Sequence, residues 1–99
     1  MTRTTGLKPE GYDWDAGNKE KSWIKHKVTF WECEQAFFNT PLKVFEDFGH
    51  AIKEKRFLAY GETNSGRRLT VVFTMRRNKV RVISGRDQNK KEEKIYEQN

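Results

Sequence analysis

A segment of alternating apolar residues near the C-terminus most constrains the fold of this chain. Every second position is apolar, at Leu69, Val71, Phe73 and Met75. This period is that of a strand with one buried face. A polar break at Arg77-Asn78 separates the segment from a second strand-like run over residues 79–86. The two runs predict an antiparallel hairpin, and its apolar face requires a covering layer.

The same hairpin carries the net charge of the chain. The stretch from Arg67 to Arg86 holds seven basic residues and no acidic one, whereas the whole chain has 20 basic and 14 acidic residues. The net charge of +6 therefore comes from this stretch. Positive charge fixed on a sheet suits a polyanion, and nucleic acid is the polyanion that we expect. The expected nucleic-acid contacts are Arg67, Arg68, Arg76, Arg77 and Lys79, together with Tyr96, on which a base could stack.

Two helices are expected before the hairpin. The first covers residues 16–26, with Trp23 and Ile24 as its main apolar anchors. The second has a sharper start, because Thr29 and Glu32 have the spacing of a capping box. A proline marks its end, since proline disfavours helical backbone in the residue before it.

Further strands and a last helix complete the expected fold. Strand-like patterns cover residues 42–46 and 56–62, and Asp87 is placed to cap a helix that reaches about Glu97. Two N-terminal helices, an antiparallel meander and a C-terminal helix predict the α+β class. We expect the helices to pack on one face of a small antiparallel sheet.

Length and composition limit the organisation of the chain. Its 99 residues allow one domain, which we place at residues 12–99, after a flexible N-terminal arm of residues 1–11. The single cysteine, Cys33, excludes an intrachain disulfide and fits a reducing cytoplasm. No apolar run approaches the roughly 20 residues of a membrane span, and the polar start is unlike a signal peptide. We therefore expect a cytoplasmic protein that does not engage a membrane.

Two arginines of the last strand are candidates for phosphate binding. Simple alternation puts Arg81 on one face of the sheet with Gly85, and Arg86 on the other. A guanidinium among apolar neighbours needs a partner. Arg81 either forms a structural ion pair with an acid such as Glu54 or Asp47, or clamps a phosphate through its two-pronged donor geometry.

Acid–base candidates lie elsewhere in the chain. His26 follows Lys25 at the end of the first helix, where it is either a general base or a histidine that caps the helix. Glu54 could accept a proton and Arg56 could bind phosphate, or both belong to a solvated charge cluster. No Gly-rich phosphate loop, catalytic triad or metal-binding carboxylate cluster is recognisable, so we expect no metal or cofactor. RNA cleavage needs none, because the 2′-hydroxyl of RNA supplies the nucleophile.

Several short motifs, in a fixed order, resemble those of one protein family. In the first half they are Tyr12-Asp-Trp-Asp15, Asn18, Lys25-His26, Val28-Thr-Phe30 and Ala36-Phe-Phe38. In the second half they are Arg56-Phe-Leu-Ala-Tyr-Gly61, Arg68-Leu69, Arg81-Val-Ile-Ser-Gly-Arg86-Asp87 and the spaced Glu93 and Tyr96. Over residues 12–97 the chain is similar to the BrnT family, the toxins of type II toxin–antitoxin pairs.

The resemblance implies a fold, an activity and partners. It implies a RelE-like fold and an endoribonuclease that arrests translation, neutralised by a ribbon-helix-helix antitoxin encoded beside it. The complex is then expected to bind operator DNA through the antitoxin. At the matching positions the resemblance implies functional roles for Lys25, His26, Arg56, Arg81 and Arg86.

The chain departs from the family pattern at three positions. Lys27 stands where the family usually has Gly, Gly85 where it usually has Ala, and Ser22 where it usually has Asn. Lys27 follows His26 directly and adds a charge at a bend.

The leading hypothesis is a metal-independent endoribonuclease in which Arg81 and Arg86 hold the scissile phosphate. Lys25, His26 or Glu54 would then assist proton transfer. The alternative is a non-catalytic nucleic-acid-binding module that uses the same basic sheet, and a third possibility is a basic face that docks an acidic partner. Scission of RNA, compared with a 2′-deoxy substrate, separates the first hypothesis from the others.

Overall fold

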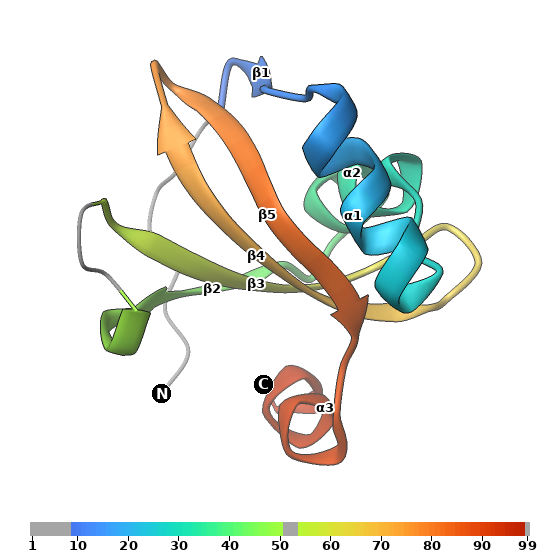
Figure 1. The fold of residues 1–99 in the computed structure, drawn as a ribbon. Coiled ribbons are helices and arrows are strands. Elements are labelled where there is room, and N and C mark those ends of the chain that lie inside the picture. Colours follow the sequence, from blue (N-terminus) through green and yellow to red (C-terminus); the bar gives the residue numbers. More distant parts are fainter. Residues whose placement is uncertain (1–8, 51–53, 99) are drawn as a thin grey trace.

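A mixed β-sheet runs through the centre of the molecule (Figure 1). The structure, a computed structural model, describes residues 9–50 and 54–98, and within them five strands form one sheet. Along the chain the strands are β1 (Gly11–Tyr12), β2 (Lys43–Asp47), β3 (Arg56–Glu62), β4 (Arg68–Arg76) and β5 (Lys79–Asp87). In space their order is β1-β5-β4-β3-β2; β1 pairs with β5 in parallel, and the other neighbours are antiparallel. The predicted hairpin and meander are confirmed, and β1 adds a short parallel edge.

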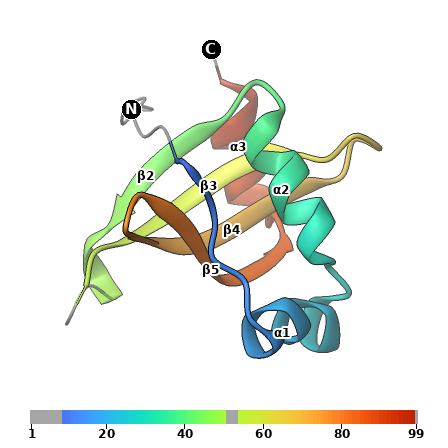
Figure 2. The same cartoon turned by 90° about the horizontal axis from the view of Figure 1, so that it is seen from above.

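Helices lie on both faces of this sheet. In the described part of the chain they are α1 (Ala16–His26), α2 (Phe30–Phe38) and α3 (Lys90–Glu97), and a 3-10 turn, η1 (Phe48–His50), follows β2. α2 covers one face, called the inner face below, with α1 beside it along the β5 edge, and α3 lies against the opposite, outer face (Figure 1 and Figure 2). The α+β class is confirmed. The expectation that all helices share one face is wrong, because the buried Glu92 of α3 bonds to Thr70 and Arg86 on the outer face. No helix in the described residues is long and apolar enough to cross a bilayer.

The helices α1, α2 and α3 each begin at a capping box. The predicted pair at α2 is present: the Glu32 N–H donates to Thr29 Oγ1 at 3.1 Å, and the Thr29 N–H donates to Glu32 Oε1 at 2.9 Å. At α3 the cap is Asn89, so the prediction of Asp87 is wrong. Asp87 still pairs with Leu69 at the end of β5, and the helix can start only after the strand has ended.

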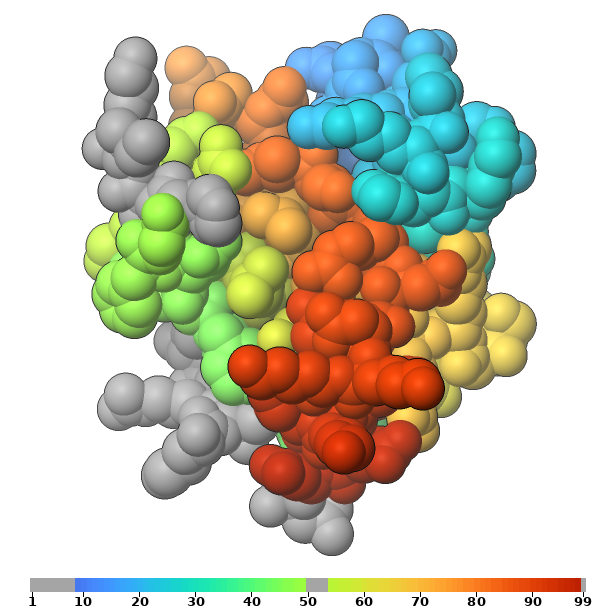
Figure 3. All heavy atoms as spheres, turned by 60° about the horizontal axis from the view of Figure 1, so that its bottom comes forward, coloured from blue at the N-terminus to red at the C-terminus, as the bar shows by residue number. Residues whose placement is uncertain are grey.

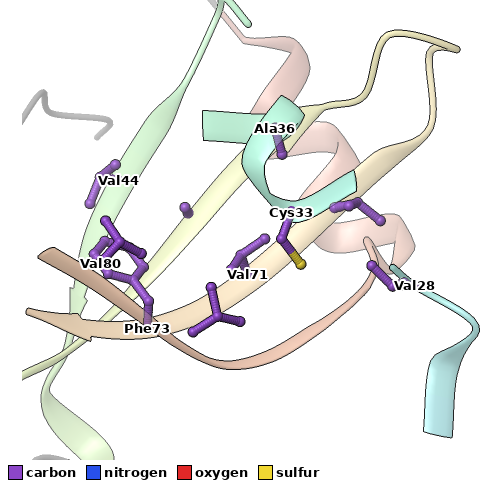
Figure 4. Close-up of a cluster of buried hydrophobic side chains, with 10 residues drawn as sticks. Val28, Cys33, Ala36, Val44, Val71, Phe73 and Val80 are labelled. Carbon is purple, nitrogen blue, oxygen red and sulfur yellow. The ribbon is translucent and has the colours of Figure 1, made fainter. Parts of the chain in front are cut away.

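The hydrophobic core lies between the inner face of the sheet and α2 (Figure 4). Phe73, in the middle of β4, is fully buried. Its ring stacks on Phe57 with centroids 5.3 Å apart and meets Phe37 of α2 edge-on at 4.9 Å. Glycine lets α2 approach the strands, because a Cβ at Gly61 would lie 2.3 Å from the carbonyl oxygen of Ala36. Such an overlap is not tolerated, so the helix–sheet distance depends on this glycine.

α1 packs on the edge of the sheet through polar side chains. The expected anchors, Trp23 and Ile24, are 49% and 67% exposed, so that prediction is wrong. The buried residues of α1 are Asn18 and Ser22. Asn18 Nδ2 donates to a carbonyl oxygen of β5 at 3.1 Å, and Ser22 Oγ accepts from the Gly85 N–H at 2.7 Å. β1 pairs with only the first residues of β5, so α1 satisfies part of the remaining strand edge.

Candidate functional site

A β-bulge changes the phase of β5. Phe73 of β4 pairs with Val82, whereas its neighbour Val72 pairs with Ser84. Ile83 is therefore an extra residue between two paired ones, which is the definition of a bulge. Because of this extra residue, odd-numbered side chains before it and even-numbered side chains after it point to the same face of the sheet.

The bulge brings two arginines to the same face. Gly85 lies on the inner face, where a Cβ would be 2.7 Å from the Sγ of Cys33. Arg81 pairs with Thr74 and Arg86 lies four β4 positions away, both on the outer face. The sequence-based placement of the two arginines on opposite faces is wrong, because simple alternation takes no account of an inserted residue. Figure 3 looks onto the outer face, with α3 in front of the strands.

Arg81 forms ion pairs with the segment that leads into α1. Its Nη2 donates to Asp15 Oδ2 at 2.6 Å, and its Nη1 lies 3.5 Å from Asp13 Oδ1. The backbone N–H of Asn18 and then Arg81 lower the pKa of Asp15 below its usual range. The side chain of Asp15 is 54% exposed, and ion pairs with such exposed partners contribute little.

Arg56 lies in the same transverse row as Arg81. Phe57 pairs with Phe73, so Arg56 comes beside Thr74, which in turn pairs with Arg81. The Thr74 hydroxyl donates to the carbonyl oxygen of Lys55, just before β3, at 2.6 Å. Two strand spacings separate the backbones of Arg56 and Arg81, about 10 Å, which two arginine side chains can bridge through one phosphate. On the other side, Arg56 pairs with Asp47 of β2.

Glu54 precedes this row and lies near it. Its Oε1 is 3.3 Å from the Nη2 of Arg76. The hydrogen bond with Asp15 is the main cause that raises the pKa of Arg81, and the negative charge of Glu54 adds a smaller effect. Both members of the Glu54–Arg76 pair are exposed. The carboxylate therefore borders the Arg56–Arg81 row and is accessible from solvent.

Arg86 occupies the other end of the outer face. Its Nη1 and Nη2 donate to the two oxygens of Glu92 at 2.7 and 2.9 Å, and the Thr70 hydroxyl donates to the same carboxylate at 3.0 Å. Burial raises the pKa of Glu92, but the bonds from Arg86, the Asn89 N–H and Thr70 outweigh it and lower the pKa below its usual value. The β4 residues that pair with Arg81 and Arg86 are four positions apart, so the backbones of the two arginines are separated by about 13 Å along the strand. The two guanidinium groups thus bind acids of different elements rather than one shared group.

Lys25 and His26 belong to a separate group at the end of α1. The His26 carbonyl accepts a bond from Arg67 Nη2 at 3.3 Å, and Arg67 also binds Asp87 at 2.6 Å and Glu32 at 3.1 Å. Arg67 therefore ties α1, α2 and β5 together, while Lys25 is exposed. The β4 residues that pair with Arg81 and Asp87 are five positions apart, about 17 Å along the strand. The group around Asp87 and the end of α1 therefore lies far from the Arg56–Arg81 row.

The remaining predicted contacts lie at opposite ends of β4. Arg68 pairs with Glu97 of α3 and lies over the ring of Tyr96, 5.6 Å from its centroid. Tyr96 is buried, and its hydroxyl donates to the carbonyl of Pro41 at 2.7 Å, so its ring packs α3 against the sheet. Arg76, Arg77 and Lys79 surround the β4–β5 turn.

Sequence reasoning missed the acids that hold these arginines. Asp13, Asp15 and Glu92 are the carboxylates that bind Arg81 and Arg86. The spacing from Asn89 to Glu92 is that of a capping box and could have identified the start of α3. No local pattern indicates the pairing of Arg81 with Asp15, which lies 66 positions earlier. Within the described residues no group of three or more His, Cys, Asp or Glu side chains is arranged to hold a metal ion.

Comparisons with known proteins find a family whose pattern covers most of the chain. The family described as "Ribonuclease toxin, BrnT, of type II toxin-antitoxin system" matches residues 14–92. No curated protein matches the chain. A similar solved structure is the 1.1 Å crystal structure of the Brucella abortus ribonuclease toxin BrnT, with a TM-score of 0.61 and 24% sequence identity. The match covers 81% of this chain and 97% of that one, which shows a common fold.

Proposed function

This chain belongs to the family of BrnT ribonuclease toxins of type II toxin–antitoxin systems, and we propose that it cleaves RNA endonucleolytically without a metal ion. The observation that carries the proposal is the row on the outer face, where Arg56 and Arg81 flank Thr74. Metal independence is supported by the chemistry of RNA, whose own 2′-hydroxyl attacks the adjacent phosphorus. The protein then has to orient the strand, stabilise negative charge and move protons.

Arg56 and Arg81 are the proposed ligands of the scissile phosphate. As the 2′-oxygen adds, the negative charge on the phosphate oxygens grows, and guanidinium donors bind the charged transition state more strongly than the ground state. One positioned donor of this kind contributes roughly 10²–10³ in rate. Arg86, about 13 Å away, is proposed to hold a second phosphate of the same strand. Binding there requires the strand to compete with Glu92 for the guanidinium.

Glu54 is the proposed general base. It borders the Arg56–Arg81 row, and its carboxylate would take the proton of the 2′-hydroxyl. The proton that Glu54 has taken, or one from water, then goes to the 5′-oxygen as its bond to phosphorus breaks, so the products carry a 2′,3′-cyclic phosphate and a 5′-hydroxyl. Lys25 and His26 lie about 17 Å from this row, so we propose that they contact the RNA strand beyond it, near the end of β5, rather than transfer protons at the scissile phosphate.

Cleavage in excess chelator tests the mechanism. A single-stranded RNA and its 2′-deoxy counterpart are incubated with the protein, and the ends of the products are identified. We expect scission of RNA alone, with 5′-hydroxyl ends. Loss of activity in chelator that Mg²⁺ restores would refute metal independence but leave the ribonuclease assignment. Arg81→Ala should lower the rate by about 10²–10³, whereas Lys90→Ala, on the exposed surface of α3, should not.

The proposed partner is a ribbon-helix-helix antitoxin encoded beside the toxin. Family membership supports an antitoxin partner, and we further propose that the complex binds operator DNA through the antitoxin. The free toxin would act in the cytoplasm and arrest translation by cutting RNA. Expression of the toxin should stop growth, and expression of the neighbouring open reading frame should restore it. Unimpaired growth with the toxin alone would contradict this proposal.

A further inference from the structure

A hollow opens where β1 meets the turn between β4 and β5. Its volume is about 520 Å³. Its walls come from two segments far apart in the sequence: Tyr12, Asp13 and Trp14 on one side, and Arg76, Arg77 and Lys79 on the other. A hollow with three basic side chains and two aromatic ones has the composition of sites that hold single-stranded nucleic acid.

Unpaired positive charge gathers at this hollow. Between Arg67 and Arg86, five of the seven basic residues form ion pairs with acids in the described part of the chain, namely Arg67, Arg68, Arg76, Arg81 and Arg86. Arg77 and Lys79 have no such partner among the described residues, and both line the hollow. An anion can bind these two cations without displacing a carboxylate. The hollow is therefore where the basic hairpin binds an anion at the lowest cost.

The backbone around the two cations is held in place. Arg77 and Asn78 have φ angles of 53° and 64°, the left-handed pair of a type I′ hairpin turn. The Glu10 N–H donates to the Asn78 carbonyl at 2.8 Å, and the Asn78 amide donates to a Glu10 carboxylate oxygen at 3.2 Å. Gly11 pairs with Lys79. These bonds join the turn to β1, so the two walls of the hollow have a defined separation.

The aromatic wall is also fixed by its neighbours. Trp14 Nε1 donates to Glu34 Oε2 at 2.7 Å, and its ring meets Phe30 edge-on at 5.7 Å. Tyr12 meets Phe37 edge-on at 6.0 Å. A rigid aromatic ring beside a phosphate-binding cation lets a base stack with little loss of side-chain entropy, and such stacking contributes about 1–3 kcal/mol per base.

The hollow continues into the arginine row of the outer face. Asp13 lines the hollow, and its Oδ1 lies 3.5 Å from Arg81 Nη1. Arg76 also lines it, and its Nη2 lies 3.3 Å from Glu54 Oε1. Lys79 and Arg81 are two residues apart on β5, about 7 Å, and point to the same face. A strand that passes Arg81 can therefore extend directly toward Lys79.

We propose that this hollow binds a nucleotide of the RNA strand next to the scissile bond, with its phosphate on Arg77 and Lys79 and its base against Trp14 and Tyr12. The inference rests on the proposed RNA cleavage at the Arg56–Arg81 row and adds a flanking subsite to it. The ligand is a single-stranded nucleotide rather than a duplex, because a paired base could not stack on the aromatic wall.

Salt-dependent binding tests the charged wall. The probe is a single-stranded 2′-deoxy oligonucleotide, which lacks the nucleophile and is not cut. Loss of the two cations that neutralise this phosphate, in Arg77→Gln/Lys79→Gln, should reduce the slope of log affinity against log salt by about 0.7. Between 50 and 200 mM salt the wild type should then lose roughly 2.6-fold more affinity than the variant. The matched control Lys90→Gln/Lys91→Gln removes the same charge from the first turn of α3 and should keep the wild-type slope. An unchanged slope in the first variant, or an equal fall in the control, overturns the proposal.

Fluorescence tests the aromatic wall. Replacing the exposed Trp23 and Trp31 by Phe leaves Trp14 as the single tryptophan. The oligonucleotide should quench Trp14 fluorescence, and the Arg77→Gln/Lys79→Gln changes should weaken the quenching. Polyphosphate and an acidic peptide of equal charge should not quench. No quenching by the oligonucleotide, or equal quenching by either control, overturns the nucleotide assignment.

The two proposals fail separately. A protein that cleaves RNA but keeps the wild-type salt slope in Arg77→Gln/Lys79→Gln contradicts the subsite alone. A protein that binds the oligonucleotide through the hollow but does not cut RNA contradicts the ribonuclease proposal and leaves the nucleotide site in place. Far-ultraviolet circular dichroism and a thermal melt of each variant separate these outcomes from misfolding.

Discussion

Replacing Glu92 by Gln tests how α3 is held on the outer face. The carboxylate accepts bonds from both terminal nitrogens of Arg86, from the Thr70 hydroxyl and from the Asn89 N–H, at 2.7 to 3.0 Å. Its side chain is 9% exposed. Gln keeps the shape and one acceptor oxygen, but it removes the negative charge and turns an N–H₂ donor toward Arg86.

The expected loss follows from these contacts. Breaking a fully buried ion pair by removing one partner costs about 3–5 kcal/mol. The Arg86 side chain is 33% exposed, so water can replace part of what it loses. We therefore expect Glu92→Gln to lower the free energy of unfolding by about 2 kcal/mol, or the melting temperature by about 10 °C. An isolated helix as short as the eight residues of α3 is not stable, so the first helix to lose its order should be α3.

The pH dependence gives the sign of the effect. The pKa of Glu92 is below its ordinary value of 4.5 in the folded protein. The unfolded chain therefore binds more protons in this range, so the stabilisation is complete above about pH 5 and is lost as the pH falls through the folded pKa. The difference in unfolding free energy between wild type and Glu92→Gln should therefore be largest above about pH 5 and should shrink as the pH falls below that.

Urea unfolding at several pH values measures both quantities. Glu93→Gln is the matched control: it removes a charge from the neighbouring position of α3, for which no hydrogen bond to Arg86 exists among the described contacts. The control should stay within about 0.5 kcal/mol of wild type. A similarly small change in Glu92→Gln, or a difference that does not depend on pH, would contradict the role of the Arg86–Glu92 pair in holding α3.

Other predictions concern the departures from the family pattern and the cysteine. Gly85→Ala should lower the free energy of unfolding by about 1–3 kcal/mol, because its Cβ would lie 2.7 Å from Cys33 Sγ. In a double-mutant cycle, adding Cys33→Ala should recover about 1 kcal/mol or more of this loss, and additive losses would contradict the steric cause. Lys27 ends α1 in the left-handed backbone region, with φ 55° and ψ 39°, which glycine adopts more easily than any other residue. Lys27→Gly should therefore stabilise the fold by about 0.5 kcal/mol in a thermal melt, despite losing the contact of Lys27 with Trp23, whereas Lys27→Ala should not. Burial, followed by the charge of Glu32, raises the pKa of the Cys33 thiol to about 12, so a thiol reagent at pH 8 should label it only in denaturant; rapid labelling of the native protein would contradict this burial.

Much of the local structure follows from patterns within a few residues. The alternation through Phe73 predicts β4, and the polar pair after Arg76 predicts a tight turn. The Thr29–Glu32 spacing predicts the start of α2, and the helix ends at Phe38, before the proline. These predictions are confirmed because capping, turn formation and strand alternation depend on neighbours in the chain.

The sequence was a weaker guide to which face of a helix or strand carries the buried side chains. Trp23 and Ile24 are apolar, yet α1 meets the sheet edge through Asn18 and Ser22, because unpaired backbone groups of β5 need hydrogen-bond partners. Apolar character indicates burial only when the neighbouring surface is apolar. Here the neighbouring surface is a strand edge.

The helices, the hairpin and the concentration of basic residues on it follow from local patterns in the sequence. Which of those basic residues lie together depends on contacts between distant segments. The extra residue Ile83 moves Arg86 onto the face of Arg81, and acids from distant segments bind both arginines while Arg77 and Lys79 remain without such partners among the described residues. Strand register and ion pairing depend on residues far apart in the chain, whose meeting is set by packing of the whole fold, so no local pattern encodes them.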